Sequence, residues 1–514
     1  MDLQRPEQPK VEPGLSATRA STRPVHPHFD AARSTVPAWR TPVIGGSHPD
    51  PSVCRVGEDY YLVCSSFEYF PGVPVLHSRD LVRWRQIGNV LDRPGQVRLP
   101  PDAPASRGVH GPTLRHDGAR FRLIATNPSA GGNFLVTADR VDGRWSDPVP
   151  VDLPGVAPDL AWDERGDCWC TTSEGHVARI DPDTGTVLEG PWRLWDARYP
   201  RAPRLHRMGE WWYLFEHGTA RVLARSRTPR GPFEPAPDDL GPACGVGGAG
   251  RADVVATPDG AWWLVLPGTR AHPSGFHAFG QEVFLAPVRL EDGWPVVGEA
   301  PAPVEDQPWQ VRDDFDEFVL APWWISPRER RTGSWSLTER PGWLTLRATG
   351  DTLDRPGGTF VGRRLRHPDS RVSVRVDAGA PVRAGLSIRR DEAHHYDFEV
   401  VPGRVDVVAR IGPVRQVVAS RTTRPGPLTL TVVTRTTDLV PPSFVRPTDG
   451  PAGVEPAGPD TLAFYVDDDP GPLAELDGRY LSDEVATGPS GRVAGMYVTR
   501  GVAAFDWFDY RGSG

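Results

Sequence analysis

The sequence repeats one local pattern five times: a tight-turn sequence leads into a short strand rich in aromatic and β-branched residues. The copies are GEDYYLV (57–63), DGARFRLI (117–124), RGDCWCTT (165–172), GEWWYLF (209–215) and DGAWWLVL (259–266). Intervals of about 40 to 60 residues are too irregular for a tandem array, but they suit four-stranded units joined by loops of variable length. The chain is therefore expected to contain five similar β-sheet units.

A second element follows each aromatic strand and has the form of two outer strands joined by a hairpin turn. These segments are HSRDLVRW (77–84), VTADRVDGRW (136–145), RIDPDTGTVLEGPW (179–192), ARSRTPRGPF (224–233) and LAPVRLEDGW (285–294). Five such units predict a five-bladed β-propeller, whose central channel is a natural place for a functional site.

The pattern stops after Pro301, and alternating strands without the aromatic repeat follow. They are TLRATG (345–350), RVSVRVDAG (371–379), GLSIRRD (385–391), HYDFEV (395–400) and GMYVTR (495–500). We expect a disordered or loosely held leader at 1–36, the propeller at 37–305 and a β-sandwich at 306–514. The stretch 438–459 is too rich in Pro and Gly for a strand and predicts a long loop.

Composition supports an all-β chain of more than one domain, since it has 514 residues with 54 Gly and 57 Pro. The net charge of −8 gives no sign of nucleic-acid or anionic-membrane binding. The N-terminus lacks an apolar leader, and no long apolar run occurs. We expect a soluble, cytoplasmic protein without a cofactor, and the sequence leaves its oligomeric state open.

Asp50 is the first candidate for chemistry, because it lies between Pro49 and Pro51 immediately before the first strand. Prolines fix φ and remove backbone donors, so this carboxylate is held on a stiff, non-helical approach. Phe67 and Phe70 follow in an aromatic turn of the kind that can stack on a sugar ring. The alternative, a rigid loop beside core aromatic residues, is equally compatible with this segment alone.

From about 40 to 512, the chain resembles glycoside hydrolase family 43, in the β-xylosidase and α-L-arabinofuranosidase branch with a C-terminal concanavalin-like β-sandwich. The motifs that carry the resemblance are SHPDPS (47–52), SSFEYFPGV (65–73), NFLVTAD (133–139), PDLAWDERG (158–166), WWYLF (211–215), ARSRTPRGPFEP (224–235), FLAPVRLEDGWPVV (284–297), LDGRYLSDEV (476–485) and AFDWFDYR (504–511). The resemblance implies a five-bladed propeller and inverting hydrolysis of glycosides, with a carboxylate base, a carboxylic acid and a third carboxylate that tunes the acid.

The resemblance assigns the base to Asp50, but two other catalytic positions depart from the family. The tuning aspartate of a Gly-Ile-Asp-Pro-Asp-Leu type motif is replaced by Ala157. The acid of a Glu-Ala-Pro-His-Leu type motif is replaced by Arg201. Arginine stays protonated at any working pH, so it is no substitute for a glutamic acid that must give up a proton.

The pocket implied by the resemblance is altered as well. Arg251 stands where a histidine often helps to hold a metal ion, so no metal is expected, and Gln281 and Arg204 replace other family residues. The expected substrate-contacting residues are Phe67, Phe70, His110, Phe134, Arg204, Arg251 and Gln281. The expected ligand is a carbohydrate, either a pentoside or an anionic sugar.

Three hypotheses follow from these replacements. Another carboxylate, Asp159 or Glu216, supplies the acid of a working hydrolase; or the protein binds sugars without catalysis; or Arg201, Arg204 and Arg251 recognise an anionic sugar by bidentate bonding. A plain structural role is also open for Asp159, as a turn cap, and for Glu216, as a surface ion pair. His394 and His395 are expected to pack within the sandwich rather than to bind metal.

Overall fold

The computed structural model describes residues 42–96, 99–100, 103–194, 203–215, 222–237, 251–270, 272, 274–298, 309–328, 332–379, 381–437, 458–486, 488 and 490–513. The leader expected at 1–36, the residues Arg201 and Glu216, and nearly all of the loop expected at 438–459 lie outside these ranges. Residues 33–514 belong to one compact unit. Within the described ranges, no helix is long and apolar enough to span a membrane.

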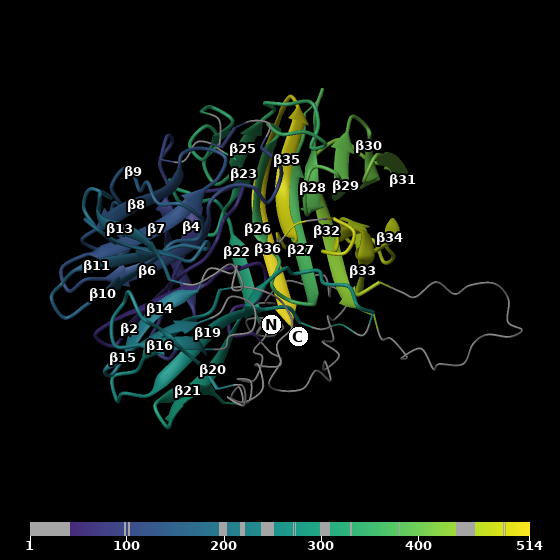
Figure 1. The fold of residues 1–514 in the computed structure, drawn as a ribbon. Coiled ribbons are helices and arrows are strands. Elements are labelled where there is room, and N and C mark those ends of the chain that lie inside the picture. The colour runs from purple at the N-terminus through teal and green to yellow at the C-terminus, as the bar shows by residue number, and fades with distance from the viewer. Residues whose placement is uncertain are drawn as a thin grey trace, which may run out of the picture. The chain divides into compact units, whose positions relative to one another are not determined.

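The first half of the chain forms five antiparallel sheets of four strands each, in sequence order (Figure 1). The first two sheets are β1 (Ser52–Val56), β2 (Asp59–Val63), β4 (Gly72–Ser78) and β5 (Arg85–Leu91), then β6 (His110–His116), β7 (Phe121–Asn127), β8 (Gly132–Ala138) and β9 (Val149–Pro150). The third is β10 (Asp159–Trp162), β11 (Cys168–Thr171), β12 (His176–Ile180) and β13 (Val187–Arg193). The last two are β14 (Arg204–Met208), β15 (Trp211–Phe215), β16 (Val222–Ser226) and β17 (Glu234–Pro235), then β18 (Asp253–Ala256), β19 (Trp262–Gly268), β20 (Glu282–Glu291) and β21 (Trp294–Val297).

These sheets are the five blades of a β-propeller, as the repeats predict. The first strands pack beside one another, β1 beside β6, β6 beside β10 and β10 beside β14, and β18 lies beside β1, which brings the last blade back to the first. Each aromatic repeat supplies the second strand of its blade, and each following segment supplies the turn between the third and fourth strands. The repeats therefore predicted both the number of blades and the order of strands within them.

Local sequence explains the blade hairpins. Between β1 and β2, Val56 pairs with Asp59 across a two-residue turn, and Gly57 takes a positive φ of 62°. A glycine at the first central position matches the turn to the twist of the two strands. The aromatic residues that follow lie between blades: the Tyr61 ring meets the Phe121 ring edge to face, with centroids 5.4 Å apart. This contact packs the first blade on the second.

The second half of the chain forms two large antiparallel sheets. One contains β22 (Trp309–Asp313), β24 (Trp335–Ser336), β25 (Leu344–Arg347), β27 (Asp369–Asp377), β32 (Leu428–Thr436), β33 (Asp460–Val466), β34 (Ala474–Asp477) and β36 (Val502–Ser513). The other contains β26 (Thr359–Arg364), β28 (Arg383–Arg389), β29 (His394–Val401), β30 (Arg404–Ile411), β31 (Val414–Thr422) and β35 (Val493–Arg500). Buried side chains from both sheets, including Val374, Leu386 and Phe464, form one core, so this half is the predicted β-sandwich. The described residues contain a single 3₁₀ helix, η2 (Gly478–Leu481).

A small sheet joins the aromatic turn of the first blade to the start of the sandwich. Strand β3 (Tyr69–Phe70) pairs with β23 (Ser326–Pro327), and the backbone N–H of Arg328 donates to the carbonyl of Glu68 at 2.5 Å. Tyr69 is buried with Ile325 and Phe360. The segment after β2 is thus fixed from both halves of the chain, which holds the neighbouring Asp50 loop in a rigid setting.

Candidate active site

The candidate site lies at the starts of the innermost blade strands. Asp50 comes just before β1, Gly111 is the second residue of β6, Ala157 comes just before β10 and Arg251 just before β18. Because the first strands pack side by side, their starts meet at one end of the ring. The fold therefore gathers residues that are up to about two hundred positions apart in the sequence.

Asp50 is held by both backbone and side-chain interactions. It has a positive φ of 51°, an uncommon conformation that aspartate tolerates better than most residues. Ser65 Oγ donates to Asp50 Oδ2 at 2.7 Å, and the Ser65 N–H donates to the Pro49 carbonyl at 2.8 Å. The carboxylate is half-buried, so it stays open to a ligand while its orientation is set.

Gly111 connects this carboxylate to the arginine of the fifth blade. Its N–H donates to Ser65 Oγ at 2.9 Å, and its carbonyl accepts from Arg251 Nη1 at 3.1 Å. A Cβ added at Gly111, whose φ is 59°, would lie 2.6 Å from the Cβ of Ala157. Only glycine fits this crossing without displacing a neighbour.

Ala157 also adopts a positive φ, of 50°, close to that of Asp50. Its N–H donates to Thr126 Oγ1 at 2.9 Å, and its side chain is buried. Alanine gains nothing from this conformation, whereas aspartate or asparagine tolerates it. The backbone at Ala157 thus has a conformation that aspartate tolerates better than alanine.

Below these residues lies a buried group of charges that we call the axial cluster: Arg115, Asp159, Arg204 and Asp253. Arg115 pairs with Asp159 and Asp253, each at 2.9 Å. Arg204 Nη1 lies 3.2 Å from Asp253 Oδ2, and Arg204 Nη2 donates to the carbonyls of Pro51 and Pro112 at 3.1 Å. The cluster ties β1, β6, β10, β14 and β18 together along the axis.

Electrostatics in the cluster follow from burial and pairing. Burial would raise the pKa of Asp253, but Arg115 and Arg204 outweigh it and hold that pKa well below its usual range. Burial lowers the pKa of Arg204 despite its two acidic neighbours. Burial and the nearby charge of Arg204 lower the pKa of Arg251 to about 9. Arg251 is only 1% exposed, and its Nε and Nη2 have no hydrogen-bond partner.

The structure places several predicted site residues away from an accessible pocket wall. Asp159 is buried, with one oxygen paired to Arg115 and the other accepting from the Leu205 N–H at 2.8 Å, so its surroundings do not favour a role as a substitute acid. Arg204 is 1% exposed, and its two terminal nitrogens donate to backbone carbonyls and to Asp253, whereas its Nε has no hydrogen-bond partner. Phe134 is 7% exposed and packs in the core between the first two blades.

The other predicted contacts lie nearer to Asp50. Phe67 is largely buried, and its backbone pairs with Val109 beside the site; Phe70 is half-buried in the sheet with β23. His110 is half-buried at the start of β6, with Nδ1 3.2 Å from the Gly108 carbonyl. Gln281 is half-buried, and its carbonyl accepts from the His48 N–H at 2.7 Å. These positions remain compatible with a ligand near Asp50.

Sequence reasoning missed Ser65 and Arg115, although both organise the site. Ser65 lies in the quoted motif SSFEYFPGV, two residues after β2, and its position after a buried strand was the available signal. Arg115 lies on the innermost strand of the second blade, where a charged side chain must find partners at the axis. That signal becomes readable only once the blade order is known.

A cation does not fit the arrangement at the axis. The Arg251 guanidinium has only donors to offer, and it occupies the place where the family resemblance implies a metal-binding histidine. Across the part of the chain that the structure describes, no group of three or more His, Cys, Asp or Glu side chains is arranged to hold a metal ion.

A five-bladed propeller with an oriented carboxylate where its innermost strands begin, followed by a β-sandwich, is an architecture that suits a glycoside hydrolase. The chain belongs to glycosyl hydrolases family 43: the family model matches residues 39–295, and the model of the β-xylosidase C-terminal concanavalin A-like domain matches residues 312–439.

Relatives match this chain over most of its length. A non-reducing end α-L-arabinofuranosidase of Bacteroides ovatus is 34% identical over 92% of this chain and 94% of its own length. A xylosidase/arabinosidase of Butyrivibrio fibrisolvens is 32% identical over 73% of this chain and 82% of its own. The solved GH43 protein BlXynB of Bacillus licheniformis superposes with a TM-score of 0.78 at 26% identity, over 91% of this chain and 99% of that one.

Proposed function

We propose that this member of family 43 acts on pentosides of the β-xylosidase and α-L-arabinofuranosidase type with strongly impaired hydrolysis. The observation that carries the proposal is the pair of matching backbone conformations at Asp50 and Ala157. One position keeps the carboxylate and its Ser65 hydrogen bond, whereas the other keeps only the conformation. The scaffold of a hydrolase is retained while part of its carboxylate set is missing.

The chemistry of inversion explains the expected defect. A carboxylate base must activate water while a carboxylic acid protonates the leaving oxygen. Asp50, oriented by Ser65, suits the base. At the position that the resemblance assigns to the acid, Arg201 keeps its proton at any working pH and so cannot protonate the leaving oxygen. Ala157 offers no carboxylate to tune an acid. Loss of a general acid typically costs a factor of about 10²–10⁴ in rate.

Specificity for anionic sugars has no support from Arg204 and Arg251, the two of the three predicted arginines that the structure describes. Arg204 and Arg251 are each 1% exposed, and both are held by backbone carbonyls, so they present no open fork to a carboxylate ligand. The site favours a neutral pentoside, with the apolar face of the sugar ring against the aromatic turn of the first blade.

Hydrolysis assays on leaving groups of different acidity test this proposal. We expect very slow turnover of xylobiose and clearly faster turnover of activated aryl xylosides or arabinofuranosides, because an activated leaving group needs no proton. Asp50→Ala should abolish both, which excludes a contaminating enzyme. The double variant Ala157→Asp with Arg201→Glu should raise xylobiose turnover. Rapid cleavage of xylobiose by the wild type, lost in Asp50→Ala, would show that another acid has taken over.

A further inference from the structure

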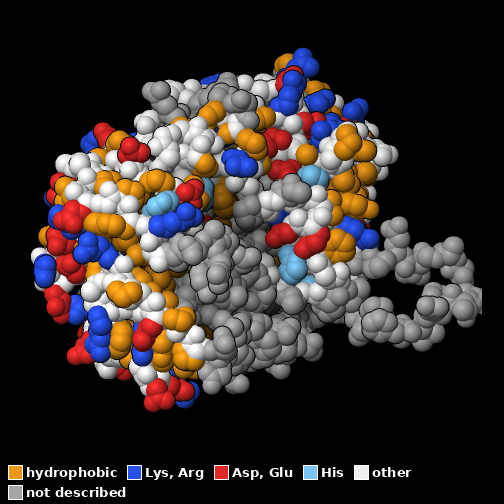
Figure 2. Space-filling model, viewed as in Figure 1, with side chains coloured by type: hydrophobic (Ala, Val, Ile, Leu, Met, Phe, Trp, Pro, Cys, Tyr) orange, Lys and Arg blue, Asp and Glu red, His pale blue; other side chains and the backbone are white. Residues whose placement is uncertain are grey.

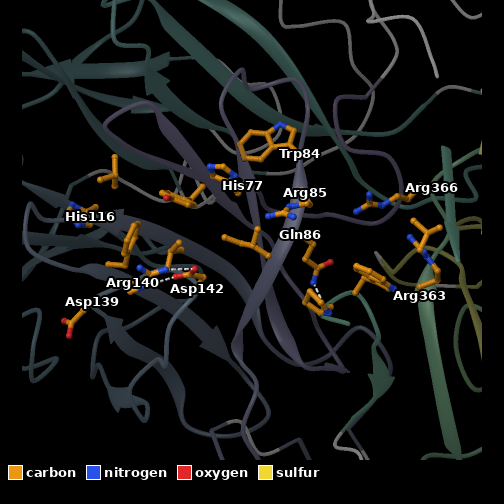
Figure 3. Close-up of a pocket in the computed structure, with 18 of the residues that line it drawn as sticks. His77, Trp84, Arg85, Gln86, His116, Asp139, Arg140, Asp142, Arg363 and Arg366 are labelled. Carbon is orange, nitrogen blue, oxygen red and sulfur yellow. Dashed lines mark hydrogen bonds and ion pairs between the residues drawn. The ribbon is translucent and has the colours of Figure 1, made fainter. Parts of the chain in front are cut away.

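A cavity of about 980 Å³ lies between the outer parts of the first two blades and the sandwich, away from Asp50 (Figure 3). Its volume is at the upper end of the range for small-ligand sites. Asp50 precedes β1, whereas the cavity is lined by Val56 at the far end of that strand, so the two places lie at opposite ends of the first blade. Nothing in the hydrolytic mechanism uses this cavity.

Aromatic side chains form much of its wall. Trp84 comes from the first blade, and Trp309 and Trp323 come from the start of the sandwich. All three are partly exposed, but Arg363 and Arg366 lie over the Trp309 ring, so Trp84 and Trp323 are left to offer apolar surface to a ligand. The buried Nε1 of Trp323 has no hydrogen-bond partner. The partly exposed indole surface suits the apolar face of a sugar ring.

Three arginines line the cavity, Arg85 from the first blade and Arg363 and Arg366 from the sandwich (Figure 3). The Cζ atoms of Arg363 and Arg366 lie 4.7 and 5.5 Å from the centre of the Trp309 ring. Among the residues that the structure describes, none of the three forms an ion pair with a carboxylate, and Nε and Nη1 of Arg363 have no hydrogen-bond partner. The wall therefore carries guanidinium groups that have no salt-bridged carboxylate among the described residues.

Burial and neighbouring positive charge lower the pKa values of Arg363 and Arg366. Burial, and then the charge of Arg366, lower the pKa of Arg363 to about 9; burial also lowers the pKa of Arg366. The acids that line the cavity are already paired, Asp142 with Arg140 at 2.8 Å and Asp139 with Arg120 at 3.1 Å. An anion beside these arginines would be attracted by their charge.

We propose that the cavity binds an acidic saccharide, with a pyranose face on the tryptophan wall and a carboxylate on the exposed Arg85 and the half-exposed Arg366. Arg363 lies deeper, with 3% exposure, and supplies positive charge from behind Trp309. The ligand class follows from the combination, since the aromatic wall favours a sugar and the guanidinium groups favour a carboxylate. The site adds a uronate-binding function to a chain whose Asp50 site favours neutral pentosides, and it does not depend on turnover there.

Titration calorimetry on the full chain carrying Asp50→Ala tests the proposal, because this background leaves the probe intact. The probe is a xylotetraose bearing one glucuronic acid substituent, and unsubstituted xylotetraose is its neutral counterpart. We expect the acidic probe to bind at least about tenfold more tightly, as a charge-assisted hydrogen bond of about 1.5 kcal/mol or more predicts. Raised salt should reduce the difference.

Variants locate the binding. Arg85→Ala with Arg366→Ala should weaken the acidic probe about tenfold or more and leave the neutral one unchanged. Arg83→Ala is the matched control: Arg83 is two residues from Arg85, exposed, and paired with Asp80 at 3.0 Å, outside the cavity. Arg85→Ala alone, at an exposed position, covers the case in which the double variant fails to fold. Equal affinity for both probes, no detectable binding, or no loss of affinity in folded arginine variants would overturn the proposal.

Discussion

Asp50 and Arg251 are linked through a single glycine. Ser65 Oγ donates to Asp50 and accepts from the N–H of Gly111, and Arg251 Nη1 donates to the carbonyl of the same Gly111. The carboxylate of the first blade, the innermost strand of the second and the arginine of the fifth therefore form one hydrogen-bonded frame. A change in any member is expected to reach Asp50, even where the altered side chain does not touch a ligand.

The first prediction concerns Ser65. Ser65→Ala removes a hydrogen bond to the ionised form of Asp50, so the pKa of Asp50 should rise, and the acidic limb of the rate profile on an activated aryl glycoside should move to higher pH. The variant also leaves the Gly111 N–H without its partner, which should lower the free energy of unfolding by about 1–3 kcal/mol. Ser65→Thr, which keeps the hydroxyl, should retain the wild-type profile. An unshifted limb in Ser65→Ala would contradict the role given to this bond.

The second prediction tests the crossing at Gly111. Gly111→Ala should destabilise the protein by about 2–4 kcal/mol, because it adds a close contact with Ala157 to the strain of a positive φ. Gly57→Ala is the matched control: its φ of 62° is nearly the same, and no atom lies within 4 Å of the added Cβ. Denaturant unfolding should give a smaller loss for Gly57→Ala. Equal losses would mean that the crossing is less tight than the structure shows.

The third prediction concerns stability and pH in the sandwich. His395 is buried as expected, but it lies between Asp397 at 2.9 Å and Asp354 at 3.2 Å. Burial opposes its charge, yet the two acids outweigh burial and raise its pKa from 6.5 to about 9. A raised pKa means that the protonated form stabilises the fold fully below pH 6.5, and that this stability, about 3 kcal/mol, is lost as pH rises through 9.

Urea unfolding between pH 6 and 9.5 measures this effect. The wild type should lose stability over that range, and His395→Gln should be less stable at pH 6 but change less with pH. His394→Gln is a nearby control, since His394 pairs with Asp391 at the end of the same strand and is not enclosed by two acids. A wild type and a His395→Gln variant with parallel pH profiles would refute the assignment.

The fourth prediction concerns metal. The guanidinium of Arg251 supplies positive charge at the axis, where a second cation would be repelled. Elemental analysis of the dialysed protein should find well below one equivalent of calcium, and neither chelator nor added calcium should shift the melting temperature, because a ligand stabilises only what it binds. Arg251→His tests whether the arginine is the reason: a gain of calcium-dependent stability would support it. A stoichiometric divalent ion in the wild type would contradict the prediction.

The architecture could be predicted from the sequence because its signals are local. Turn residues followed by alternating aromatic strands specify a hairpin wherever they occur, and five copies specify five blades. The switch to strands without the aromatic repeat after Pro301 marked the sandwich in the same way. Asp50 could be singled out for a similar reason, since its flanking prolines restrict the backbone before any tertiary contact forms.

The positions of charged residues depend more on tertiary structure than the architecture does. Figure 2 shows acidic and basic side chains interspersed over the visible face of the blades, much as composition suggests. The arginines of the second cavity are different, because Arg85 and Arg366 come from two halves of the chain and line one cavity only in the folded protein. No pattern within either half marks them as neighbours.

Tertiary structure likewise decided where the side chains of Asp159, Arg204 and Phe134 lie. Their motifs placed them near the site, but ring closure put Asp159 and Arg204 in the axial cluster, and blade packing put Phe134 in the core. Burial makes a charge find a partner wherever the fold offers one, and that partner can be more than a hundred residues away. The sequence by itself determined the blades, the sandwich and the carboxylate at position 50, whereas only the closed ring decided which charged groups pair inside and which remain open to a ligand.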